Sequence, residues 1–153
     1  MEATKFNKEK EEYREVEDIL KGYRDLLDRI ETIKEEMREL KEFYLGCGAI
    51  EYGECTGPTY KFNSSVENEV VDKEKRLAQL NIELTRCTIL KNRIDNAVSK
   101  LEDVDKKVIE YRYINKRSLG WKEIAFAINY SESHCRNRIK PRAIKSMIRH
   151  IIY

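Results

Sequence analysis

The stretch WKEIAFAINYSESHCRNRI, residues 121–139, predicts two short helices joined by a tight turn. Apolar residues recur three or four positions apart in its first half and so share one face of a helix. These residues are Trp121, Ile124, Ala125 and Ile128. Asn129 tolerates the left-handed backbone that ends a helix, and Ser131 can cap the next helix by accepting from its free amides. Tyr130 is expected to fill the space beneath the turn.

The second helix of this stretch is expected to bury Cys135 and Ile139, which lie four residues apart. Its opposite face then carries side chains that can reach bases or phosphates in a major groove. These are Ser133, Arg136, Asn137 and Lys140. Any helical hairpin shows short amphipathic pieces, but a small residue, a turn residue and a cap at this spacing favour a DNA-binding unit.

Charge is distributed unevenly along the 153 residues, although the net charge is only +2. Residues 1–44 hold 10 basic and 14 acidic residues, whereas residues 104–153 hold 12 basic and 4 acidic residues. A basic C-terminal third is typical of a nucleic-acid surface. The alternative is a charged face that is merely solvated.

Two long helices are predicted ahead of the basic third. Apolar residues in residues 1–44 follow a heptad-like spacing with one shift, and Gly22 is the weak helix former within it. Residues 64–103 show a second apolar seam at three- and four-residue steps. The predicted fold is therefore all-α, a long antiparallel helical hairpin followed by a helix-turn-helix domain at 104–153.

Residues 45–63 hold four of the six glycines and one of the two prolines, which predicts a loop between the long helices. Cys47 and Cys55 lie in this loop, separated by seven residues. Zinc sites are typically built from more closely spaced pairs, so we expect unmodified thiols, no metal and no cofactor.

No apolar run approaches the length of a membrane span, and the charged N-terminus does not resemble a signal peptide. We therefore expect a cytoplasmic protein with no membrane partner, in which the four cysteines are reduced.

Residues 104–135, VDKKVIEYRYINKRSLGWKEIAFAINYSESHC, resemble the C-terminal module of sigma-70-type factors that reads the −35 promoter element. The chain is most similar to ArpU- and RinA-like regulators of phage and prophage late transcription, which join a long helical region to a sigma-like helix-turn-helix. The matching residues are Val108, Ile109, Glu110, Arg112, Tyr113, Leu119, Trp121, Glu123, Ile124, Ala125, Tyr130, Ser131, Glu132, Cys135, Arg142 and Ala143.

The resemblance implies base readout by Glu132, Ser133, Arg136 and Asn137. The complete set of predicted base-reading residues adds two neighbours on the same helix, His134 and Lys140. A second set is expected to hold phosphates. That set is Lys116, Arg117, Ser118, Lys122, Ser131, Arg138 and Arg142. For Lys116, Arg117 and Ser118 the reason is that amides at a helix start favour anions, and the alternative is that they are solvated loop residues.

The chain departs from the family pattern near the end of the recognition helix. The family has an aliphatic residue where Arg138 stands, and Ile139 follows one position later, as if one residue were added. Pro141 is predicted to end this helix near Lys140 and to begin a final helix that reaches about Ile151. The apolar face of that final helix either covers the domain or makes a dimer contact. Its members are Ile144, Met147, Ile148 and Ile151.

These features predict a sequence-specific regulator that binds double-stranded DNA, contacts RNA polymerase and forms a homodimer through its long helices. The alternative is a phage DNA-packaging protein of the small-terminase type, which also joins a helix-turn-helix to long helices. An enzyme is not expected, because no paired carboxylates, activated nucleophile or phosphate loop stands out.

Overall fold

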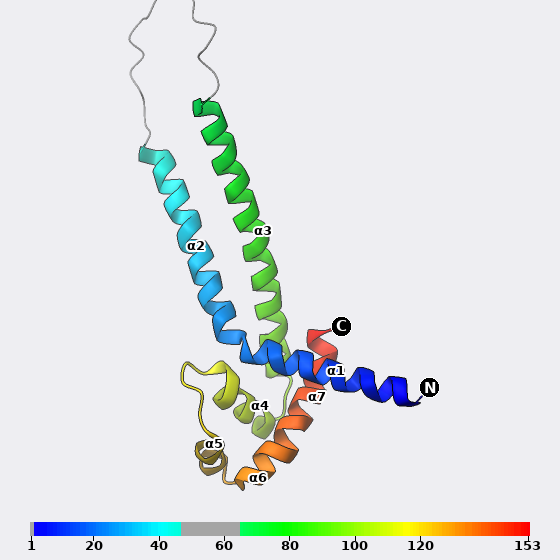
Figure 1. Ribbon diagram of the computed structural model, residues 1–153. Helices are drawn as coiled ribbons and strands as arrows, with labels where there is room; N and C mark the ends of the chain where they lie inside the picture. The colour runs from blue at the N-terminus through cyan, green and yellow to red at the C-terminus, as the bar shows by residue number, and fades with distance from the viewer. Residues whose placement is uncertain (1, 47–64) are drawn as a thin grey trace, which may run out of the picture. The chain divides into compact units, whose positions relative to one another are not determined.

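All regular structure in residues 2–46 and 65–153, which the computed structural model describes, is helical (Figure 1). This confirms the predicted all-α class. In chain order the elements are α1 (Glu2–Lys21), α2 (Tyr23–Gly46), α3 (Ser65–Ser99), α4 (Asp103–Ile109), the π-helical turn η1 (Glu110–Ile114), α5 (Trp121–Ile128), α6 (Glu132–His134), the π-helical turn η2 (Cys135–Ile139) and α7 (Lys140–Ile151).

The helix predicted for residues 1–44 is divided at Gly22 into α1 and α2. The backbone hydrogen bonds continue across the division, from Gly22 N–H to Asp18 O (3.0 Å) and from Leu26 N–H to Gly22 O (2.9 Å). Glycine is a weak helix former and a common site of helix bending, which explains why the division falls there.

The chain forms two compact units, and α2 and α3 each contribute to both. Unit 2, residues 29–87, is the pair of α2 and α3 segments (Figure 1). Ile33 and Met37 on α2 pack against Leu80 on α3, and all three side chains are buried. Arg29 binds Glu83 (2.7 Å) and Arg76 binds Glu36 (3.1 Å), so the two segments run in opposite directions.

Unit 1 comprises residues 1–28 and 88–153. Its larger core joins residues that are far apart in the sequence, from α1, the start of α2, the end of α3, α4, η1 and α7. The buried members are Val16, Leu20, Tyr23, Ile94, Ala97, Val98, Ile109, Tyr113, Ala143, Ile144, Met147 and Ile151. The predicted C-terminal domain at 104–153 therefore shares its core with α1.

The apolar face predicted for the last helix is buried against α1 within unit 1 (Figure 1). Ile144 and Met147 are fully buried there, next to Val16 and Leu20 of α1. Of the two roles considered for this face, covering the domain is the one that the structure shows.

The final helix has the predicted bounds, since α7 spans Lys140–Ile151 with Pro141 in its first turn, but the backbone is not interrupted there, because Lys140 keeps helical angles (φ −54°, ψ −52°). The Lys140 N–H donates to Cys135 O, five residues back, which defines the wider π turn. A proline ring clashes with the carbonyl four residues before it in an α-helix. The π turn accommodates one extra residue and widens the helix just before Pro141, which gives the ring room.

Leu45 and Gly46, expected at the start of the loop, are the last residues of α2. The rest of the predicted loop, including Cys47 and Cys55, lies outside the described residues. No helix in the described ranges combines the length and the apolar character needed to cross a membrane.

Candidate nucleic-acid interface

The turn between α5 and α6 has the backbone that its sequence predicts. Asn129 adopts the left-handed conformation (φ 57°, ψ 43°), and its N–H donates to Ala125 O. Ser131 then caps α6, since its hydroxyl oxygen accepts from the His134 N–H at 3.2 Å. Both local predictions are confirmed, and together they fix the direction in which α6 leaves the turn.

The start of α5 is held by a side chain that the sequence reading did not single out for this role. The Glu123 carboxylate accepts from the Gly120 N–H at 2.7 Å, which satisfies one free amide at the helix start. Arg112 lies over the Trp121 ring at 5.2 Å from its centre and donates to Leu119 O at 3.1 Å. The connector before α5 is thus bound to η1.

A small core beneath the turn orients α6 and η2. Ile124 and Ala125 of α5 pack with Cys135 and Ile139, and these four side chains are buried as predicted. Burial raises the pKa of the Cys135 thiol, which therefore stays protonated and unreactive. Because Cys135 and Ile139 face inward, the intervening polar side chains face solvent.

We call these exposed side chains the α6–η2 surface. It consists of Ser133, His134, Arg136, Asn137 and Arg138. The Asn137 amide donates to the Ser133 hydroxyl at 3.2 Å, and Tyr130 stacks on His134 with ring centres 5.4 Å apart. Among the described residues, Arg136 and Arg138 have no ion-pair or hydrogen-bond partner. The surface therefore presents cations and amide groups to solvent.

Tyr130 differs from its prediction. It was expected to fill the space beneath the turn, but its side chain is 46% exposed and lies along His134. The core below the turn is formed by other residues, among them Ala125 and Ile139.

Two residues of the predicted base-reading set are less accessible. Glu132 is half-buried. Lys140 binds Glu17 of α1 at 2.8 Å, and both side chains are less than one-fifth exposed. Tyr113 donates to the same carboxylate at 3.4 Å. Lys140 therefore connects η2 to α1, and we exclude it from the α6–η2 surface.

The predicted phosphate-binding residues fall into two groups: exposed cations near α5 and on η2, and side chains that hold parts of the fold together. Lys116, Arg117 and Lys122 are exposed around the start of α5, where Arg117 binds Glu123 at 3.3 Å. Arg138 is exposed on η2. The Ser118 hydroxyl donates to Arg112 O at 2.9 Å, while Ser131 serves as the α6 cap described above. Arg142 binds the buried Asp105 carboxylate and is thereby held against α4.

An open groove of about 630 Å³ runs beside the α6–η2 surface. It is lined by His134, Arg138, Ile139 and Arg142. Two arginines and an imidazole on its walls make it suited to an anionic strand rather than to an apolar ligand.

Phe126 is the feature of this region that the sequence reading missed. Its ring is 88% exposed on α5, one residue outside the apolar face that the helix buries. The only signal in the sequence is its position, since Phe126 does not fit the three- and four-residue spacing of Ile124, Ala125 and Ile128. Among the described residues no group of histidine, cysteine and carboxylate side chains could hold a metal ion.

Comparison with family models matches residues 28–150 to one family, described as "Protein of unknown function (DUF722)". No curated protein matches the chain, and no solved structure does.

Proposed function

This chain belongs to the DUF722 family, described as of unknown function, and from the α6–η2 surface we propose that it binds double-stranded DNA as a sequence-specific transcription regulator. In this proposal α5, its turn and the continuous α6–η2 helix act as a helix-turn-helix, with α6 and η2 entering the major groove. Arg136 and Asn137 read bases, with Ser133 and His134 beside them, while Arg138, Lys122, Lys116 and Arg117 contact phosphates.

One observation carries this proposal. The left-handed Asn129 and the Ser131 cap direct a helix whose solvent face holds Arg136, Asn137 and Arg138, for which the described part of the chain supplies no carboxylate partner. Arginine and asparagine are the side chains that form bidentate hydrogen bonds with guanine and adenine in the major groove. The excess of basic over acidic residues in residues 104–153 supports the same surface, because phosphates dominate DNA affinity.

The biological context follows from the sequence resemblance alone. We propose a sigma-like regulator of phage or prophage late genes that acts in the cytoplasm, contacts RNA polymerase at the promoter and forms a homodimer. If it belongs instead to a packaging machine of the small-terminase type, its mass in solution would correspond to a large ring. A monomer or dimer by light scattering is the result that the regulator proposal expects.

The DNA-binding proposal is tested by selecting duplexes from a random pool with the full-length protein. We expect one enriched sequence, and binding that weakens steeply as salt increases because counterions are released from the phosphates. The sequence enriched by the variant Arg136→Ala should have lost its preference at one base pair. The matched control is Lys145→Ala, which removes one exposed cation from α7 and should leave the enriched sequence unchanged.

Two results would count against the proposal. One is a pool that shows no enrichment for the unmodified protein. The other is equal weakening by Arg136→Ala and Lys145→Ala, which would mean that the α6–η2 surface is not where DNA binds.

A further inference from the structure

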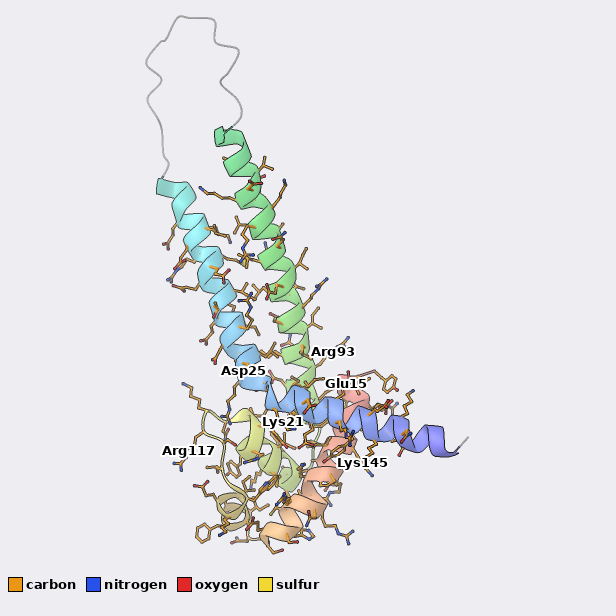
Figure 2. All side chains as sticks on the ribbon, in the orientation of Figure 1. Glu15, Lys21, Asp25, Arg93, Arg117 and Lys145 are labelled. Carbon is orange, nitrogen blue, oxygen red and sulfur yellow. The ribbon has the colours of Figure 1, made fainter. Side chains whose placement is uncertain are left out.

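A polar pocket of about 260 Å³ lies in unit 1, and none of its lining residues belongs to the α6–η2 surface. It forms where the turn at Gly22 meets η1 and the connector before α5. Figure 2 shows Lys21 and Asp25 at this turn and Arg117 on the connector. The lining residues are Lys21, Arg24, Asp25, Arg112, Tyr113 and Ser118.

The charges of this pocket are unbalanced. Lys21, Arg24 and Arg112 supply three cations, and Asp25 is the single acidic side chain in the lining. Two of the cations are already oriented. Lys21 binds Asp18 at 2.9 Å, and Arg112 is fixed by its hydrogen bond to Leu119 O and its position over Trp121. Because Lys21 is already paired with Asp18, Arg24 and Arg112 are the two cations left against Asp25, and the pocket keeps an excess of one positive charge.

Arg24 is the unusual member of the lining. Its Nε–H is buried, yet it has no hydrogen-bond acceptor among the residues that the structure describes. A buried donor without an acceptor is unfavourable, and a donor that belongs to a charged group is more unfavourable still. An anion in this pocket would supply acceptors to the guanidinium of Arg24.

We propose that this pocket binds a phosphate group. The oxygens of a phosphate group accept from guanidinium groups, and Arg24 and Arg112 present two guanidinium groups to this pocket. The group is either a free phosphate compound or a phosphate of duplex DNA. In both cases it would connect the Gly22 turn, through Arg24, to the connector that leads into α5. The proposal does not depend on base readout by the α6–η2 surface.

The free-phosphate arm of the test is a titration of the full-length protein with inorganic phosphate, at constant ionic strength, followed by backbone amide NMR. We expect saturable shifts at Gly22 and Ser118. Arg24→Gln should weaken binding about ten-fold, the scale of a hydrogen bond to a charged group. Asp25→Asn should strengthen it, a gain that damage to the fold would not produce. Arg93→Gln, an exposed arginine on α3 outside the pocket, is the matched control and should change nothing.

The DNA arm measures duplex affinity as a function of salt for the same variants. If the phosphate comes from DNA, Arg24→Gln should flatten the logarithmic salt dependence by about one unit while Arg93→Gln leaves it unchanged. Lys21→Gln, at an exposed position, repeats both arms should Arg24→Gln fail to fold. The proposal is overturned if phosphate causes no saturable shift and neither pocket variant alters the salt dependence more than Arg93→Gln does.

Discussion

Arg142 of α7 binds the carboxylate of Asp105 through two guanidinium nitrogens, with Nε to Oδ2 at 3.0 Å. Asp105 is only 4% exposed, whereas the Arg142 side chain reaches solvent. The carboxylate raises the pKa of the Arg142 guanidinium through a hydrogen bond and through its charge. The pair therefore fixes α7 to α4 next to the proposed DNA surface.

We expect Arg142→Ala to lower the free energy of unfolding by about 1–3 kcal/mol, because it leaves a buried carboxylate without its partner. Urea denaturation measures this change. Lys145→Ala on the same helix is the control and should change stability by less than about 0.5 kcal/mol, as exposed substitutions usually do. An Arg142→Ala protein that is as stable as the control would show that the pair contributes nothing to the fold.

Arg136→Ala should weaken binding to the selected duplex by about 1–3 kcal/mol and relax the preference at one base pair, if the guanidinium binds a guanine. Competition binding against duplexes that differ at single positions measures both effects. Arg138→Ala serves for comparison and should weaken binding to all duplexes alike. Uniform weakening by Arg136→Ala as well would assign Arg136 to the phosphates instead.

The left-handed Asn129 predicts an ordered series of stabilities. Asn129→Ala should lower the free energy of unfolding by about 1 kcal/mol, because a Cβ without a polar side chain is disfavoured at φ 57°. Asn129→Gly should be close to neutral, since glycine adopts this conformation without steric conflict. Thermal unfolding of the three proteins tests the order. A glycine variant less stable than the alanine variant would contradict it.

Stability should fall at alkaline pH, and Tyr13 contributes to the fall. Burial, with a smaller effect from the charge of Glu17, raises the pKa of Tyr13 to about 12. The unfolded phenol titrates near its usual pKa of about 10. Between these values the unfolded chain has released a proton that the native chain retains, so the free energy of unfolding decreases as the pH rises.

Denaturation curves between pH 10 and about 12 measure this effect. Tyr13→Phe should reduce the slope of stability against pH without abolishing it, because burial also raises the pKa of Tyr23 and Tyr113. An unchanged slope would mean that Tyr13 ionises equally easily in the folded and unfolded chains.

Local chemistry explains which parts of the fold the sequence could predict. The conformations of Asn129 and Ser131 depend on neighbours within a few residues, and both were predicted correctly. The burial of Cys135 and Ile139 follows from helical spacing. The seams of residues 1–44 and 64–103 predicted long helices, and α2 and α3 are helices that lie almost entirely within these ranges.

Contacts between distant residues explain the rest. Lys140 looks like a surface cation in the sequence, and its partner Glu17 lies 123 positions away. The partner of α1 is also distant in the sequence. Its apolar seam was expected to pack on the other long helix of the hairpin, but the end of α1 packs on α7. The pocket around Arg24 also assembles from three separate segments, so no local pattern could indicate it.

The π turn η2 also has a consequence for how the chain tolerates changes in length. Cys135 and Ile139 belong to the core beneath the α5–α6 turn, whereas Ala143 and Ile144 belong to the core shared with α1. One unbroken helix serves both, and the added residue of the π turn offsets the phase of its second half by roughly 100° from the α-helical register. A single-residue deletion in η2 that converts it to an α turn would keep both sets of anchors facing their cores, whereas a deletion elsewhere between the two sets would turn one set away. Selection can therefore act on the number of residues between the two sets, independently of which side chains those residues carry.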